Sequence, residues 1–510
     1  MAERNKILNT ILKGAAVTSV GIFFSKALSY FYRVIVARML GTEAYGNLSI
    51  GIMVVGIATT IGIFSLHEAL NNYIPKYKQR DDWSGIKGLV KSTFKIGLLA
   101  SLFTSLALFF GSGIIANRIF EEPELVNVIK IMALVPPFSI IGSLALDTTK
   151  GLQIAKYHAF TRQIMQPIVQ LIATVVLVVL GFEIAGAAFG WFLGAFASAV
   201  LGLYFMEYRA GPILRRDVSG RNQGEKALRY SFPLLLSGAV GTVVGWTDTA
   251  FLGYFLDSTA VGLYNAALPT ALLLLIPYQA LSFLVLPSMS EVIERDDREL
   301  SSTLKTVARW TFMISFPIFC LMALFSEQIL HVLFGTDFTS ASTALTILSF
   351  GYLFSASVGH LDSVVKALGH TNLIFKNTLV NVVVNIALNI ILIPSYGMIG
   401  AAVATTISTV FAQSLLLFEV YYFQGSSPFT SSTLKPAFSA GISLVTVYIL
   451  LKIVFNTVPL WALLPGIISY LLLYLIFTYL LGLEEADKEI LETINTKVKE
   501  SRAFSQISSK

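Results

Sequence analysis

Two basic residues, Lys26 and Arg33, lie inside the first long apolar segment of the chain, over residues 13–38. A lysine or arginine at the centre of a membrane-spanning helix costs about 2.5 to 3.5 kcal/mol on insertion scales. Tyr30, Arg33 and Ala37 follow Lys26 at spacings of four, three and four residues, so the set shares one helix face. We expect this face to line a hydrated cavity that takes a negatively charged cargo. The alternative is that both cations extend along their aliphatic stems to opposite interfaces.

Carboxylates also lie inside later apolar segments. Asp248 is in the middle of the segment 226–256, and an ionisable residue at that depth is by default a functional candidate. We expect Asp248 to bind a coupling ion or to partner a cavity cation, and the alternative is a protonated or hydrogen-bonded carboxyl between helices. His67 and Glu68 form a second candidate proton site, because both side chains titrate in an accessible range once perturbed. A polar helix end is the alternative for that pair.

Two acid–base pairs stand at matching places in the chain. Asp147 and Lys150 are three residues apart, which permits an ion pair within one helix. Asp362 and Lys366 are four residues apart, and the same pairing is open to them. We expect both lysines to face one central cavity as substrate-binding residues and both aspartates to be candidates for ion coupling. Pairs that only neutralise themselves near the inner interface are the alternative.

Amide side chains form a stripe with a spacing of four residues over Asn377, Asn381, Asn385 and Asn389. Asn381 and Asn385 are candidates for binding sugar hydroxyls, and hydrogen bonding between helices is the alternative. Arg38, at the outer end of the first segment, is a further substrate-binding candidate, with an interface anchor as its alternative. The sequence contains no phosphate-binding glycine loop, no cysteine–histidine metal cluster and no nucleophile motif. We therefore predict no catalytic residue, no metal and no cofactor.

The elements that must position these residues are membrane-spanning helices. The 510 residues are 55% hydrophobic and 13% charged, whereas charged residues make up about 25% of an average soluble domain. A helix of about 20 apolar residues crosses a bilayer. About fourteen segments meet this length: 13–38, 44–73, 86–116, 126–151, 157–181, 185–208, 226–256, 259–289, 302–333, 340–369, 372–393, 397–424, 433–455 and 459–482. The predicted fold class is an all-α integral membrane protein.

Basic residues gather in the loops on one side of these segments, and the loops on the other side are short and more acidic. The positive-inside rule then places both termini in the cytoplasm of a multi-pass cell-membrane protein. The net charge of +6 does not indicate nucleic-acid binding, because the basic residues stand in short loops. We expect membrane lipids, rather than nucleic acid, as the surroundings of this chain.

Matching motifs indicate an internal repeat. Thr42–Gly46 (TEAYG) follows the first segment, and Ser258–Gly262 (STAVG) follows the seventh. Six segments are an even number, so both copies share one topology, which is a parallel repeat about an axis along the membrane normal. The predicted domains are a six-helix lobe at 1–208, a cytoplasmic linker at 209–225, a second six-helix lobe at 226–424, two additional helices at 425–482 and a cytoplasmic tail at 483–510.

The chain also resembles a known family. Ala37–Gly46 (ARMLGTEAYG) resembles the opening of the polysaccharide-exporter flippases of the multidrug/oligosaccharidyl-lipid/polysaccharide (MOP) exporter superfamily. Tyr230–Leu234 (YSFPL), Asp248, Val261–Ala267 (VGLYNAA) and Leu286–Ser290 (LPSMS) resemble the matching part of the second half. The resemblance covers nearly the whole chain, and its motifs are loose one by one but specific in their order and spacing.

The resemblance implies two six-helix lobes around a central cavity that work by alternating access. Such proteins move a saccharide linked to polyprenyl phosphate or diphosphate from the inner to the outer leaflet. The two additional helices resemble those that line a lipid-tail groove in lipid-linked glycan flippases. First-helix cations face the cavity in those flippases, and Lys26 and Arg33 occupy comparable places.

The predicted function is therefore a flippase for a lipid-linked oligosaccharide, with a cationic central cavity and no enzymatic activity. A membrane potential or a gradient of protons or sodium ions would drive it, and we expect a monomer. An ion-coupled antiporter for cationic drugs is the alternative, which would require a net acidic cavity. A membrane-embedded glycosyltransferase or polymerase is a further alternative, against which the short outer loops argue.

Overall fold

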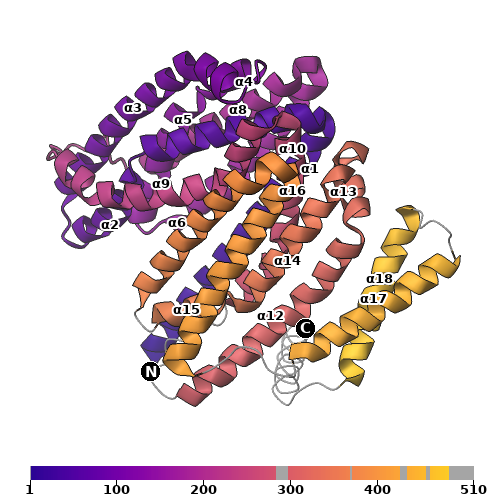
Figure 1. The fold of residues 1–510 in the computed structure, drawn as a ribbon. Helices are drawn as coiled ribbons and strands as arrows, with labels where there is room; N and C mark the ends of the chain where they lie inside the picture. Colours follow the sequence, from indigo (N-terminus) through magenta and orange to yellow (C-terminus); the bar gives the residue numbers. More distant parts are fainter. Residues whose placement is uncertain (1, 283–296, 368–369, 426–432, 455–459, 482–510) are drawn as a thin grey trace, which may run out of the picture. The chain divides into compact units, whose positions relative to one another are not determined.

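Every regular element in the described part of the chain is a helix (Figure 1). The computed structural model describes residues 2–282, 297–367, 370–425, 433–454 and 460–481. The Leu286–Ser290 motif and the predicted tail at 483–510 therefore lie outside the described residues. The prediction of an all-α fold is confirmed.

The first half of the chain folds into ten α-helices, and short π-helical turns extend α3, α6, α7 and α8 at residues 115–119, 160–165, 178–182 and 205–209. The helix α3 begins after Asp82, whose carboxylate accepts a hydrogen bond from the Gly85 amide at 2.7 Å and so caps the helix. The helices are α1 (Ala2–Gly62), α2 (Leu66–Gln79), α3 (Trp83–Ile114), α4 (Leu125–Met132), α5 (Val135–Gly151), α6 (Ala155–Ala159), α7 (Gln166–Leu177), α8 (Glu183–Tyr204), α9 (Gly224–Phe255) and α10 (Ser258–Ala271).

The described part of the second half of the chain is also made of α-helices and short helical turns. Short 3-10 turns lie at Leu272–Leu275 and Thr336–Ala341. Its labelled helices are α12 (Asp297–Leu324), α13 (Ser326–Phe334), α14 (Ser342–Val358), α15 (Leu361–Ala367), α16 (Thr371–Gln424), α17 (Leu434–Val454) and α18 (Leu460–Leu480).

Residue contacts divide the chain into two compact units. The first unit comprises Met1–Pro269, Leu333–Ala341 and Asn389–Ala401, and the second comprises Thr270–Val332, Ser342–Leu388 and Ala402–Lys510. These units group residues by mutual contact, whereas the predicted lobes rest on the internal repeat. The six-plus-six organisation therefore stays a prediction.

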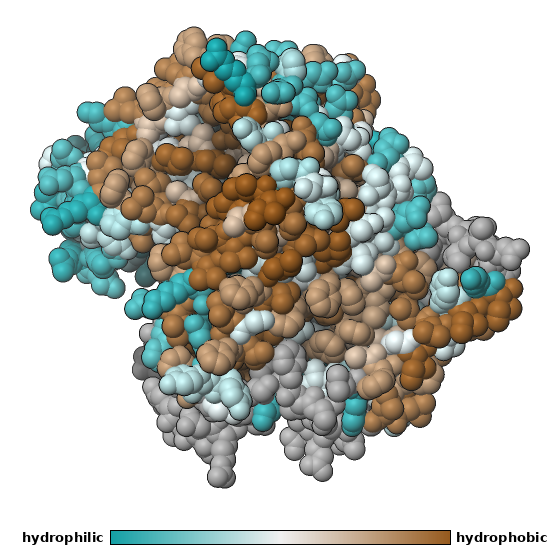
Figure 2. Space-filling view, in the orientation of Figure 1, coloured by the Kyte–Doolittle hydropathy of each residue, from teal (hydrophilic) through white to brown (hydrophobic). Residues whose placement is uncertain are grey.

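Ten helical stretches in the described residues are long and apolar enough to cross a membrane, and Leu464–Leu480 is a shorter apolar helix. Large apolar side chains are exposed on these stretches, and Figure 2 shows hydrophobic side chains over much of the visible face. Three of the ten contain a glycine with non-helical geometry: Gly41, Gly181 and Gly397. Their φ angles of 78°, 90° and 59° suit glycine alone at low cost. The multi-pass membrane architecture is confirmed, and the total of fourteen spans stays a prediction.

The two copies of the repeat motif contact each other within the first unit. A Cβ atom on Gly46 would lie 1.7 Å from the carbonyl oxygen of Ser258, and a Cβ on Gly262 would lie 2.0 Å from the carbonyl oxygen of Thr42. Each motif therefore presses its glycine against the first residue of the other motif. Such a reciprocal contact is what a two-fold relation between equivalent segments produces.

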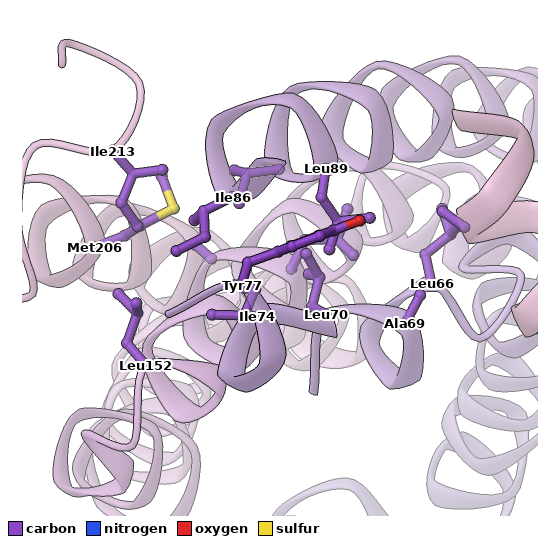
Figure 3. Packing of buried hydrophobic residues seen from close by; sticks show 14 of the residues in the cluster. Leu66, Ala69, Leu70, Ile74, Tyr77, Ile86, Leu89, Leu152, Met206 and Ile213 are labelled. Carbon is purple, nitrogen blue, oxygen red and sulfur yellow. The ribbon is translucent and has the colours of Figure 1, made fainter. Parts of the chain in front are cut away.

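The predicted linker is packed rather than loose. Ile213, between α8 and α9, is 1% exposed and belongs to an apolar cluster with side chains of α2 and α3 (Figure 3). Met206 from the end of α8 and Leu152 after α5 complete the same cluster. Burying these side chains fixes the chain between the two halves onto the ends of α2 and α3.

In the second unit, α18 supplies a hydrogen bond to a backbone carbonyl of α12 that a proline leaves without a helical partner. Pro317 has no amide hydrogen, so the carbonyl of Met313, four residues earlier, lacks its helical partner. The Tyr474 hydroxyl donates to that carbonyl at 2.7 Å, and the Tyr470 hydroxyl donates to the Pro317 carbonyl at 3.3 Å. The two tyrosines thus bind α18, one of the predicted additional helices, to α12.

Candidate functional site

A cavity of about 170 Å³ lies inside the first unit. The turn at Gly41 brings the two arms of α1 to the same cavity, and α7, α8 and α9 complete its wall. Its lining residues are Ser29, Tyr32, Arg33, Tyr45, Ser49, Ile52, Pro167, Gln170, Trp191 and Trp246. The cavity therefore combines one guanidinium with hydroxyls, an amide and four aromatic rings.

Several polar atoms around this cavity form no hydrogen bond of normal geometry among the described residues. The Tyr32 hydroxyl lies among Thr174, Gln170 and Trp191, and its ring meets the Trp191 ring edge-on with centroids 6.4 Å apart. The Tyr32 hydroxyl, Trp191 Nε1 and Thr174 Oγ1 are nevertheless buried without a hydrogen bond of normal geometry. Buried polar groups nearly always have a partner. Tyr32 and Trp191, which line the cavity, are therefore positioned to bind a polar molecule in it.

The wall beside Arg33 is fixed by an interhelical bond. Tyr45 is 2% exposed, and its hydroxyl donates to the carbonyl oxygen of Asn265 on α10 at 3.4 Å. That carbonyl has no helical partner, because Pro269 lacks the amide hydrogen four residues later. The bond holds Tyr45 in the cavity wall.

The other first-helix candidates lie elsewhere. Lys26 and Arg38 are exposed, and neither lines the cavity. The Tyr30 ring packs edge-on against the Phe334 ring, with centroids 6.5 Å apart. Of the predicted first-helix set, the structure thus brings Arg33 into the cavity wall, while Lys26, Tyr30 and Arg38 are placed outside it.

Asp248 joins three helices within the first unit. Its Oδ2 accepts a hydrogen bond from the Tyr264 hydroxyl of α10 at 2.5 Å, and its Oδ1 accepts one from Asn389 Nδ2 of α16 at 2.8 Å. Asn389 is fully buried. Next to this bridge, Asn265 Nδ2 donates to Thr249 Oγ1 at 3.2 Å. The carboxylate is hydrogen-bonded between helices, as the alternative prediction had it.

The ion pair that the spacing of Asp147 and Lys150 permits is not formed among the described residues. Asp147 is 6% exposed and accepts a hydrogen bond from Asn71 Nδ2 at 3.2 Å, with His158 Nε2 at 3.9 Å. Lys150 is exposed at the end of α5. Asp147 points into the packed interior of the first unit, whereas Lys150 lies at the exposed helix end, so the pair does not form despite a spacing that allows it. Partners on α2 and α6 satisfy the carboxylate instead.

His67 and Glu68 contact each other at 3.5 Å near the start of α2. His67 Nδ1 is buried without a hydrogen-bond partner among the described residues, and Glu68 is exposed. The pair lies on the same helix as Asn71, the partner of Asp147. These residues form a polar group at the end of the first unit's helices that is separate from the Arg33 cavity.

In the second unit, the predicted pair of Asp362 and Lys366 is formed, with Nζ and Oδ2 2.6 Å apart. Two of the four asparagines in the amide stripe on α16 donate to the other arm of the same helix. Asn377 Nδ2 donates to Glu419 at 2.7 Å, and Asn385 Nδ2 donates to Thr405 Oγ1 at 3.1 Å. Asn381 is half-buried between them. For Asn385 these contacts match the alternative prediction of hydrogen bonding between helices.

Sequence reasoning missed Arg162. This residue lies inside the segment 157–181, and its guanidinium bonds Ser143 Oγ and, at 3.5 Å, Gln166 Oε1. The rule that selected Lys26, a cation inside an apolar segment, applies equally to Arg162. No comparable signal marks Trp191 or Trp246, because tryptophans are ordinary residues of membrane helices. Among the described residues, no group of three or more acidic, histidine or cysteine side chains could hold a metal ion.

Two family models match this chain over more than half of its length. The model described as "Polysaccharide biosynthesis protein" matches residues 11–293, and the one described as "Lipid II flippase MurJ" matches residues 153–477. The chain belongs to the polysaccharide flippase family of the MOP superfamily. The resemblance of the chain to this family is thereby confirmed.

Individual relatives agree with this membership. This flippase-family chain is 25% identical over 434 residues to an uncharacterized membrane protein, MJ1068, of Methanocaldococcus jannaschii, covering 81% of this chain and 83% of that one. It is 30% identical over 193 residues to the probable low-salt glycan biosynthesis flippase Agl15 of Haloferax volcanii, but spans only 38% of this chain and 40% of that protein. A solved structure titled "Lipid II flippase MurJ, inward closed conformation" has the same fold, with a TM-score of 0.70 and 18% identity over 91% of this chain and 98% of the other.

Proposed function

We propose that this chain moves an oligosaccharide linked to polyprenyl phosphate or diphosphate from the cytoplasmic to the outer leaflet of the cell membrane by alternating access. Membership of the polysaccharide flippase family supports a transporter of this cargo class. The observation that carries the proposal is the Arg33 cavity. In this proposal the chain carries out no catalysis, acts as a monomer and has both termini in the cytoplasm.

The chemistry of the cavity suits a phosphate that carries a sugar. The Arg33 guanidinium presents parallel donors that match two phosphate oxygens. Trp191, Trp246 and Tyr32 present aromatic faces and hydroxyl or indole donors, and the Gln170 amide can both donate to and accept from sugar hydroxyls. A water molecule takes about 30 Å³ of liquid volume, so a cavity of about 170 Å³ has room for only a few water-sized groups. It therefore accommodates the phosphate end of the headgroup and not the whole glycan. The rest of the glycan and the lipid tail must extend beyond it.

Asp248 is our candidate for ion coupling. The Tyr264 hydroxyl and the Asn389 amide both donate to its carboxylate, so the group is prearranged between three helices. A proton or a sodium ion that binds the carboxylate would change these bonds and thereby the packing of α9 against α10 and α16. A change in interhelical bonds is the two-state element that an ion gradient needs.

A leaflet-sidedness assay in proteoliposomes tests the function. A fluorescent polyprenyl-diphosphate glycan is added, and a membrane-impermeant quencher measures the fraction in the outer leaflet over time. Protein-dependent movement of the glycan lipid is the expected result, and a cationic dye in parallel vesicles should stay in place. Gradient-driven dye movement with a static glycan lipid would contradict the proposal and would favour the antiporter.

A further inference from the structure

A second and larger groove, of about 1170 Å³, lies in the first unit where α3 and α9 begin. It is open to the outside and contains none of the residues of the Arg33 cavity. Its lining combines a basic rim with an apolar floor: Phe64, Gly88, Lys91, Ser92, Lys95, Ile96, Leu99, Gly220, Asn222, Gly224, Glu225, Leu228, Arg229, Phe232 and Pro233. The flippase mechanism proposed above uses none of these side chains.

The rim of the groove is positively charged. Lys91 and Lys95 lie one helical turn apart on α3, and Arg229 faces the groove from α9. Like charges at this spacing repel each other. None of the three cations forms an ion pair with a residue that the structure describes. Glu225 is the one acidic lining residue among those described, so the rim carries an excess of positive charge that an anion would balance.

The floor of the groove continues into the lipid-facing surface. Leu99 on α3 is 60% exposed, and Phe232 on α9 is 57% exposed. From Leu98 to Ile114, α3 presents further exposed apolar side chains. Lys91 and Lys95 precede this apolar band directly, which is the place of phospholipid headgroups relative to a membrane-spanning helix. The groove therefore joins a cationic site at headgroup depth to an apolar path at chain depth.

The docked linker fixes the wall of the groove. A Cβ on Gly88 would lie 1.8 Å from the carbonyl oxygen of Arg221, so the linker backbone lies directly on α3. The Ser92 hydroxyl donates to Asn222 Oδ1 at 3.1 Å and accepts from the backbone amide of Gln223 at 3.2 Å. Arg221 pairs with Asp82 at 2.8 Å. These bonds hold the linker and α3 together, so the groove is formed before any ligand binds.

We propose that this groove binds an anionic phospholipid of the leaflet that faces the starts of α3 and α9. The lipid phosphate lies between Lys91, Lys95 and Arg229, and one acyl chain runs along the floor over Leu99 and Phe232. Basic pockets between membrane helices recognise acidic headgroups through this combination of charge and depth. A soluble phosphate would use the rim but leave the apolar floor exposed, and a zwitterionic lipid would leave the excess positive charge unbalanced.

The test is native mass spectrometry of the whole protein in detergent, titrated with palmitoyl-oleoyl phosphatidylglycerol or phosphatidylcholine. The wild type should retain phosphatidylglycerol in preference to phosphatidylcholine. Each basic residue near an anionic lipid contributes about fivefold in affinity, so the Lys91→Gln/Lys95→Gln double variant should bind phosphatidylglycerol about 30-fold more weakly. Arg80→Gln, an exposed cation outside the groove, is the matched control and should bind as the wild type does.

A charge-retaining variant, Lys91→Arg/Lys95→Arg, should bind phosphatidylglycerol as the wild type does, because binding follows the positive charge, and a melting temperature of the glutamine variant equal to that of the wild type excludes a failure to fold. Equal retention of both lipids by the wild type would overturn the proposal, as would unchanged binding in the glutamine variant. Displacement of the lipid by glycerol phosphate alone would assign the rim to a soluble anion. Preferential retention of polyprenyl phosphate over phosphatidylglycerol would assign the groove to the transported lipid instead.

Discussion

Two polar regions of the first unit differ in how well their buried groups are satisfied. At the Asp248 bridge, both carboxylate oxygens accept a hydrogen bond, from Tyr264 at 2.5 Å and from Asn389 at 2.8 Å. At the Arg33 cavity, the Tyr32 hydroxyl and Trp191 Nε1 are buried without a hydrogen bond of normal geometry among the described residues. Both regions lie inside a membrane protein, where an unsatisfied polar group is costly.

This difference distinguishes polar groups that stabilise the fold, at the Asp248 bridge, from polar groups that are positioned to bind a ligand, at the Arg33 cavity. A buried donor without a hydrogen bond destabilises the protein by about 1–3 kcal/mol. We therefore expect such a donor where it contributes to function, and beside a cavity that holds a guanidinium this function is ligand binding. The Asp248 bonds, in contrast, already stabilise the contact of three helices, and an ion can act there only by changing them.

The largest expected effect comes from removing the cavity cation. Arg33→Ala should lower glycan-lipid translocation about 100-fold, because truncating one partner of a buried charge pair costs on the order of 2–5 kcal/mol. The measurement is the initial rate in the leaflet-sidedness assay at equal protein density. Arg38→Ala, an exposed cation on the same helix, is the control and should transport normally. Equal rates in wild type and Arg33→Ala would remove the cavity from the mechanism.

The second effect concerns coupling at the bridge. Asp248→Asn keeps the size of the side chain but removes its charge, and its amide group faces the donors of Tyr264 and Asn389. Transport should fall about tenfold, the equivalent of one lost charge-assisted hydrogen bond, and should no longer respond to a proton or sodium gradient. The test is the transport rate with each gradient imposed in turn. An unchanged dependence on both gradients would make Asp248 a purely structural residue.

The third effect separates folding from transport at the same bridge. Tyr264→Phe removes the hydroxyl that donates to Asp248 and leaves the ring in place. Since hydrogen bonds to charged groups contribute about 1.5–3 kcal/mol, the variant should unfold at a clearly lower temperature in detergent. Thermal unfolding followed by tryptophan fluorescence measures this. A melting temperature equal to that of the wild type would mean that the bridge does not stabilise the helix contact.

Much of this arrangement follows from the sequence because charges are rare in membrane helices. The cost of burial alone marks Arg33 and Asp248 as functional candidates, and the apolar runs mark the helices. The failures have equally physical reasons. Asp147 and Lys150 have a spacing that allows a pair, but the partner of Asp147 comes from α2, which spacing within one helix cannot reveal. Trp191 carries no charge, so its place in the cavity wall depends on packing alone.

Tyr32→Phe should have the smallest effect on stability. It is also the most direct test of the difference between the Arg33 cavity and the Asp248 bridge. It makes the same chemical change as Tyr264→Phe, the loss of one buried phenolic hydroxyl, but at a hydroxyl that forms no hydrogen bond of normal geometry among the described residues. Its melting temperature should therefore equal or exceed that of the wild type, since an unsatisfied polar atom is removed. Glycan lipid should stabilise the wild type by mass action, and it should stabilise Tyr32→Phe less, because one hydrogen bond to the ligand, worth about 1 kcal/mol or fivefold in affinity, is lost. If Tyr32→Phe instead destabilised the empty protein as much as Tyr264→Phe does, the Tyr32 hydroxyl would have a structural partner, and the two regions would not differ in the way proposed.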